Sequence, residues 1–219
     1  MEADRPRISP LGARALLFDI AGRDFDEAVQ RRIWAACRDA ARLPGVKEAL
    51  PGMNNMMVVF GGETRSEALS ELLREVWANA EPLDGAGRMF EAPTIYGGAD
   101  GSDLGELAER TGMTAVEVAH LHAAGDYSVA AVGAMPGFVY LSGLDPRLAW
   151  PRRSSPRPNV PAGSVIIGGA QAGVLPVTAP TGWRSIGRTD LRLFDTGAEE
   201  PALLRPGDRL KFTVVDVLA

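Results

Sequence analysis

The chain has 219 residues, of which 46% are hydrophobic, and a formal net charge of -5. That length and hydrophobic fraction suffice for one core or two modest ones, which excludes an intrinsically disordered chain. An acidic chain does not attract polyanions overall, so nucleic-acid binding would require a strong local basic patch.

The composition also predicts the compartment. The single cysteine, Cys37, permits no internal disulfide, and no Cys or His cluster has the spacing of a structural zinc site. Residues 1–10 lack the apolar segment of a secretory leader, and no later apolar run approaches the roughly 20 residues of a membrane helix. We expect a cytoplasmic protein without metal or membrane segment.

The first predicted elements are a strand over Ala13–Ile20 and a helix over Phe25–Leu43. The strand is short, apolar and bounded by glycines, whereas the helix repeats apolar residues at intervals of three and four until Pro44-Gly45 ends it. Two strands follow, over Val46–Leu50 and Met56–Phe60.

A second helix and a last strand complete this half of the chain. Thr64 and Glu67 have the spacing of a capping box, and an apolar stripe from Leu69 to Trp77 follows them. Met89–Tyr96 reads as the last strand. The order strand, helix, strand, strand, helix, strand predicts a small ferredoxin-like α+β domain over residues 1–95.

After a turn-rich linker from Tyr96 to Asp103, two short helices are predicted over Leu104–Arg110 and Ala115–His122. They are joined across Gly112, and Thr114 with Glu117 has capping-box spacing. A DNA-binding helix-turn-helix has the same outline, but the second helix contains no Arg or Lys to contact phosphate or guanine. We therefore predict no nucleic-acid binding.

Beyond Asp126 the helical period disappears, and short apolar runs alternate with Gly and Pro. This pattern predicts an all-β domain, closed or nearly closed into a barrel, within residues 96–219. The predicted strands lie at Tyr127–Val132, Val165–Ile167, Val174–Val177, Leu191–Phe194 and Lys211–Val217.

No self-contained catalytic motif is present. The sequence has no Gly-x-x-x-x-Gly-Lys-Ser/Thr phosphate loop, no Gly-x-Ser-x-Gly nucleophile elbow and no biotin-attachment context around either lysine, Lys47 or Lys211. A hydrolase that works alone through its own nucleophile is poorly supported.

An ordered series of short motifs occupies the C-terminal half instead. In chain order these motifs are Tyr96-Gly97-Gly98, Leu121-His122, Gly133-Ala134-Met135-Pro136-Gly137-Phe138, Pro151-Arg152-Arg153, Pro161-Ala162-Gly163-Ser164, Gly182-Trp183, Ile186-Gly187-Arg188-Thr189 and Pro206-Gly207-Asp208. Together they resemble the family of 5-oxoprolinase B subunits, also called allophanate hydrolase subunit 1 or KipI. Ala134, Leu175 and Thr181 depart from the family pattern, where phenylalanine, tyrosine and glycine are usual.

The resemblance implies a C-terminal barrel of the cyclophilin-like type and a role as one subunit of an enzyme. Its partners would be the C subunit, which is related to allophanate hydrolase subunit 2, and the A subunit. The implied reaction is the ATP-driven opening of 5-oxoproline to glutamate, with ATP bound in the complex and the chain inactive alone. Two alternatives stay open: a carboxyltransferase half in a urea-type, biotin-dependent system, and a KipI-like inhibitor of a sensor histidine kinase.

Four arginines are candidate substrate-binding residues, because a guanidinium holds a carboxylate through two parallel hydrogen bonds. Arg152, Arg153 and Arg157 lie in a Pro-rich loop, where the alternative is a solvated basic surface. Arg188 either binds ligand or pairs with a carboxylate of the barrel.

His122 and Gln171 are the candidate catalytic residues. The imidazole of His122 titrates near neutrality and suits proton transfer, whereas the alternative is a histidine that caps a helix end. Gln171 either donates a hydrogen bond to an oxyanion or bonds its own turn. Trp183 either lines a pocket or packs in the core.

Overall fold

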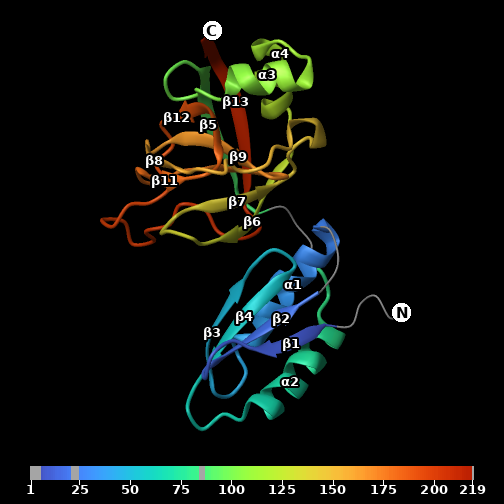
Figure 1. Cartoon of the computed structure of the whole chain (residues 1–219). Helices are drawn as coiled ribbons and strands as arrows, with labels where there is room; N and C mark the ends of the chain where they lie inside the picture. The colour runs from blue at the N-terminus through green and yellow to red at the C-terminus, as the bar shows by residue number, and fades with distance from the viewer. Residues whose placement is uncertain (1–5, 21–24, 84–86, 219) are drawn as a thin grey trace. The chain divides into compact units, whose positions relative to one another are not determined.

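The computed structural model describes residues 6–20, 25–83 and 87–218. The chain divides into two compact units between residues 85 and 86. The labelled elements of both units are drawn in Figure 1.

The N-terminal unit is a two-layer α/β arrangement. Its four strands form an antiparallel sheet in the order β1-β2-β4-β3. Alternate residues of β2 and β4, among them Phe18 and Val58, share one buried cluster with residues of both helices, such as Ile33 and Leu73. The elements are β1 (Arg7–Pro10), β2 (Ala15–Asp19), α1 (Glu27–Ala40), β3 (Val46–Pro51), β4 (Asn55–Phe60) and α2 (Ser66–Asn79).

The predicted ferredoxin-like order is not confirmed. The strand expected after the second helix forms as β5 (Met89–Gly97), but it belongs to the C-terminal barrel. The edge of the sheet beside β2 is taken by β1, which was not predicted from the sequence. A short turn joins β1 to β2 and lets the two strands pair antiparallel, so the fourth strand of the sheet comes from the segment before β2. The predicted boundary between residues 95 and 96 consequently falls inside β5.

The two predicted capping motifs have different outcomes. At α4 (Ala115–Ala123) the Thr114 hydroxyl accepts from the Glu117 amide, and the Glu117 carboxylate accepts from the Thr114 amide. At α2 the prediction from Thr64 was wrong, because the helix begins at Ser66 and the residue before it makes no side-chain cap.

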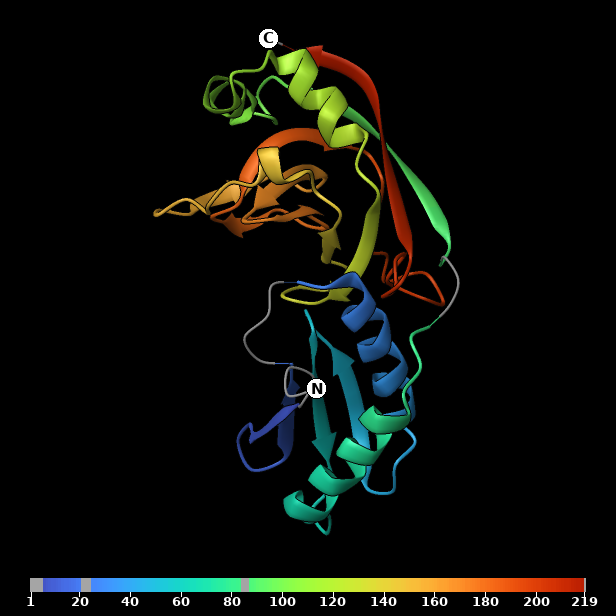
Figure 2. The same ribbon diagram turned by 90° about the vertical axis from the view of Figure 1, so that its right-hand side faces the viewer.

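The C-terminal unit is built on a closed barrel of the strands β10-β7-β6-β13-β5-β12-β9. Neighbouring strands are antiparallel except β5 and β13, which run in the same direction and are seen side by side in Figure 2. The further elements are α3 (Leu104–Thr111), α4, β6 (Tyr127–Val132), β7 (Val139–Ser142), a 3-10 turn η2 (Pro146–Leu148), β8 (Arg157–Val160), β9 (Ser164–Gly168), β10 (Gln171–Val174), β11 (Ala179–Thr181), β12 (Arg184–Thr189) and β13 (Arg209–Leu218).

The barrel confirms the closed all-β prediction, with local differences. The run Leu191–Phe194 is not a strand, since only Phe194 forms an isolated bridge, with Ala202. The strands β7, β8, β11 and β12 were not predicted from the sequence. The strand predicted over Val174–Val177 was misplaced, since β10 (Gln171–Val174) shares only Val174 with it.

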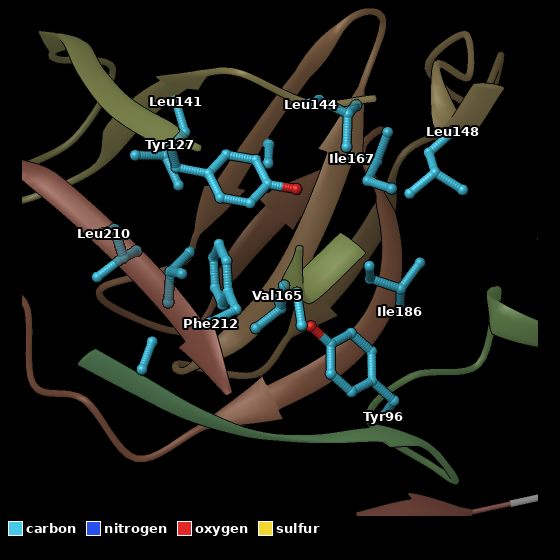
Figure 3. Close-up of a cluster of buried hydrophobic side chains, with 14 of the residues drawn as sticks. Tyr96, Tyr127, Leu141, Leu144, Leu148, Val165, Ile167, Ile186, Leu210 and Phe212 are labelled. Atoms are coloured by element: carbon cyan, nitrogen blue, oxygen red, sulfur yellow. The ribbon is translucent and has the colours of Figure 1, made fainter. Parts of the chain in front are cut away.

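The wall of the barrel separates two apolar clusters. Every residue of β9 is buried. Val165 and Ile167 belong to the main core, which Figure 3 shows, whereas Ile166 belongs to a second, smaller cluster. This second cluster contains Phe138, Val160, Ile166, Leu175 and Trp183. Within the described ranges, no helix is long and apolar enough to cross a membrane.

Candidate functional site

His122 lies in the main core of the barrel unit. Its side chain is fully buried, and its Nδ1 is 2.8 Å from the hydroxyl oxygen of Tyr96. The Tyr127 hydroxyl donates to the His122 carbonyl, and the Phe212 ring centre is 4.6 Å from the imidazole centre. Burial lowers the pKa of His122 to about 3, so the ring is neutral near pH 7. This environment favours a structural role over proton transfer.

Figure 3 shows Tyr96, Tyr127 and Phe212 among the side chains that fill this core. Burial raises the pKa of both tyrosines above the ordinary value, so their hydroxyl groups stay protonated. The cluster is therefore a neutral hydrogen-bonded network inside the barrel unit.

Gln171 is the first residue of β10 and is half-buried. It pairs with Gly168 across the turn that connects β9 and β10, in which Gly169 adopts a positive φ of 66°. Gln171 lines neither of the two cavities described below.

A buried carboxylate organises the arginine-rich loop. The side chain of Asp103 is 1% exposed, and its two oxygens accept from both terminal nitrogens of Arg157 at 2.7 Å each. Arg153 Nη1 is 3.0 Å from the same carboxylate, and Arg184 Nη1 is 3.7 Å from it. The amide of Ser185 donates to it at 2.7 Å. Arg153 and Arg157 are thus held in a structural ion-pair cluster and are not a solvated basic surface.

Asp103 and Arg184 were not predicted as site residues from the sequence. Asp103 precedes α3 and lies 50 residues before Arg153, so no local pattern relates the two. Arg184 directly follows the Gly182-Trp183 motif, and its guanidinium carbon lies 4.1 Å from the centre of the Trp150 ring. An acidic residue directly before a predicted helix was the available signal in the sequence, but such a residue reads equally as an N-cap.

The second apolar cluster borders a cavity of about 400 Å³, here called the wall cavity. Phe138, Tyr140 and Trp183 face one another edge to face, with ring centres 5.0 to 6.0 Å apart. Both charged lining residues are arginines, Arg152 and Arg153. The lining residues are Ala134, Met135, Phe138, Tyr140, Arg152, Arg153, Pro156, Leu175, Pro180, Thr181, Gly182 and Trp183.

The lining brings together motifs that are far apart in the sequence. The segment before β7, the Pro-Arg-Arg loop and the β11–β12 connection all contribute to it. The three departures from the family pattern, Ala134, Leu175 and Thr181, line this same cavity. Trp183 therefore has both predicted roles, since it is 5% exposed and also lines the cavity.

Arg188 lies elsewhere, beside a larger cavity of about 840 Å³. Its guanidinium is 3.5 Å from Asp100 and 3.6 Å from Asp190, which matches the predicted pairing with carboxylates of the barrel unit. Because two acidic groups neutralise the one cation there, we regard the smaller wall cavity as the stronger candidate for an anionic ligand.

No group of three or more His, Cys, Asp or Glu residues suited to a metal ion occurs among the residues that the structure describes.

A closed barrel whose wall bears an aromatic cavity with guanidinium groups defines a domain suited to binding small anionic molecules. Residues 6–204 match the model of the carboxyltransferase domain, subdomain C and D. The chain belongs to this carboxyltransferase-domain family, within the branch of the 5-oxoprolinase B subunits.

Curated relatives place it in that branch. It is 45% identical to the 5-oxoprolinase B subunit of Escherichia coli O157:H7 over 186 residues, which are 84% of this chain and 85% of that protein. It is 36% identical to the protein of the same name from Bacillus subtilis (strain 168), over 95% of this chain and 92% of that one.

Solved structures agree in fold. The crystal structure of TTHA0988 matches with a TM-score of 0.80 and 34% identity over 92% of this chain, which spans only 40% of that longer polypeptide. The urea carboxylase of Kluyveromyces lactis matches with a TM-score of 0.80 at 20% identity, over 96% of this chain and 22% of that one. At that identity the likeness is one of fold alone.

Proposed function

We propose that this chain is the B subunit of an ATP-dependent 5-oxoprolinase that opens the lactam ring of 5-oxoproline to give glutamate. The observation that carries the proposal is that three curated relatives, 45%, 40% and 36% identical over 84% to 95% of the chain, are all named as the B subunit of 5-oxoprolinase. The wall cavity supports it through Arg152, because the substrate carries a carboxylate that a guanidinium can bind.

The chain works as part of a complex in this proposal. The name B subunit implies companion chains, and we propose that these are the A and C subunits, that ATP is bound in the complex, and that the chain alone is inactive. The lack of a phosphate loop and of a nucleophile motif in the sequence supports this division of labour. We place the complex in the cytoplasm, where ATP is available and Cys37 would remain a thiol.

Reconstitution tests the proposal. The chain is purified with the candidate A and C subunits, and glutamate formation from 5-oxoproline is measured with and without ATP. We expect activity only when all three chains and ATP are present. A complete, folded complex that releases no glutamate would overturn the proposal.

The same preparation addresses the carboxyltransferase alternative, which the fold accommodates but does not favour. The complex is mixed with a biotin carboxylase, a biotinylated carrier, bicarbonate and urea, and urea carboxylation is followed. We expect none. No contact within the described parts of the chain favours the kinase-inhibitor alternative.

A further inference from the structure

We infer that the wall cavity binds a small ring-shaped carboxylic acid, with the carboxylate on Arg152 and one face of the ring against the aromatic wall formed by Phe138, Tyr140 and Trp183. The inference rests on the proposed function only for the identity of the ring acid, 5-oxoproline. It assigns substrate binding to this chain and to this cavity.

The first argument is charge. Arg153, Arg157 and Arg184 share the buried carboxylate of Asp103. Arg152 differs from these three, because it makes no ion pair with a carboxylate among the described residues. Its guanidinium instead lies over the Trp183 ring, 5.3 Å from the ring centre. The cavity is therefore bordered by a cation with no carboxylate partner and by no acidic residue, which favours an anion.

The second argument is shape. A volume of about 400 Å³ lies near the lower end of the range for small-molecule sites, and apolar or aromatic side chains make up much of the lining. Phe138 and Trp183 are nearly perpendicular at 87°, so the cavity offers flat ring faces and edges to a ligand. Tyr140 and Thr181 are the lining residues with hydroxyl groups, which suit a lactam N–H or C=O.

The third argument is that contacts within the chain hold the wall in place. A Cβ added at Gly168 would overlap the Trp183 indole, so the ring packs directly on the backbone of β9. The amide of Arg153 donates to the Gly182 carbonyl at 2.6 Å, and Asp103 holds the Arg153 side chain. The loop that carries Arg152 is thereby fastened to the segment that carries Trp183. A preformed site loses less conformational entropy when it binds.

The test combines binding with kinetics. Calorimetry of the full chain and of its Arg152→Ala variant uses 5-oxoproline, 2-pyrrolidinone, which lacks the carboxylate, and inorganic phosphate. In the reconstituted complex, KM and kcat are measured for Arg152→Ala, Arg152→Lys and Trp183→Leu. Arg192→Ala is the matched control, since Arg192 is an exposed arginine of the same unit paired with Asp195 at 3.0 Å.

We expect 5-oxoproline to bind at least about tenfold more tightly than either 2-pyrrolidinone or phosphate, because a charge-assisted hydrogen bond and the ring contact act together. Arg152→Ala should raise KM roughly tenfold or more with kcat within about twofold, and Arg152→Lys should recover part of that loss. Trp183→Leu should also raise KM, whereas Arg192→Ala should leave both parameters unchanged.

The outcomes separate this inference from the proposed function. An active complex whose Arg152 and Trp183 variants, correctly folded, keep the wild-type KM overturns the inference and leaves the function intact. Equal binding of phosphate and 5-oxoproline, or of 2-pyrrolidinone and 5-oxoproline, also overturns it. An inactive complex with carboxylate-dependent, Arg152-dependent binding of the ring acid would overturn the function and support the cavity assignment.

Discussion

At the scale of single residues, the buried imidazole of His122 makes the stability of the barrel unit depend on pH. Burial lowers its native pKa to about 3, whereas an unfolded histidine titrates near 6.5. Between about pH 6.5 and pH 3 the imidazole is therefore protonated in the unfolded state but neutral in the native state. The contribution of His122 to the free energy of unfolding is complete above pH 6.5 and decreases as the pH falls toward 3, by up to about 1.4 kcal/mol per pH unit.

We predict that protonation of His122 in the unfolded state lowers the free energy of unfolding by about 2 kcal/mol between pH 7 and pH 5. His122→Gln should remove that part of the pH dependence, measured by urea unfolding at several pH values within this window. His120→Gln is the matched control, because His120 is exposed on the same helix and its replacement should keep the slope. Equal slopes for all three proteins would refute the argument.

Asp103 is the second residue with a predictable energetic effect. Its carboxylate is almost completely buried and accepts from Arg153, Arg157 and the Ser185 amide. Asp103→Asn leaves partly buried guanidinium groups without their counter-ion, which should cost about 3 kcal/mol in urea unfolding. Asp195→Asn, at an exposed pair with Arg192, should cost less than about 0.5 kcal/mol. Similar losses for the two variants would contradict a special role for Asp103.

At the scale of elements, the two Thr-x-x-Glu sequences give a matched comparison. Thr114 caps α4 in a complete capping box, whereas Thr64 lies before the start of α2 and caps nothing there. Thr114→Ala should destabilise the first turn of α4 by about 1 kcal/mol, which is about fivefold faster hydrogen exchange of its amides. Thr64→Ala should leave exchange at the start of α2 unchanged. Faster exchange in both helices would mean that Thr64 also caps.

The same pair shows what a local pattern can and cannot predict. The pattern of apolar residues predicted both long helices and β4 to within a few residues, because an element with a buried face has apolar residues at regular, nearby positions. Whether a capping signature forms depends on where the helix begins, and at Thr64 the amide instead donates to the Gly61 carbonyl in the turn after β4. Short strands such as β8 and β11, each with a proline, carry no readable alternation.

Non-local pairing limited the prediction of the site as well. Arg152 and Arg153 lie in a loop as predicted from the sequence, whereas Arg157 is the first residue of β8. The carboxylate that holds Arg153 and Arg157 comes from the residue before α3. A sequence shows where the guanidinium groups are, but the carboxylate that pairs with each one depends on the folded barrel. As a result Arg153 and Arg157 pair with Asp103, whereas Arg152 does not.

At the scale of the whole molecule, the structure predicts where the chain can be cut. β5 lies between β13 and β12 in the closed barrel, with Ala92, Thr94 and Tyr96 buried. Removing it would open the barrel, leave two strands with unpaired edges, and take these side chains out of the core. The boundary between residues 85 and 86 keeps β5 with its partners, whereas the sequence-based boundary between residues 95 and 96 does not.

We therefore predict that a fragment of residues 86–219 folds by itself and that a fragment of residues 96–219 does not. Circular dichroism should show a cooperative thermal transition for the longer fragment only, and proton NMR should show dispersed amide signals for it alone. The two fragments differ by one strand, so the shorter one tests whether closure of the barrel is required. A cooperative transition at the same midpoint in both fragments would mean that β5 is dispensable and that the remaining strands close without it.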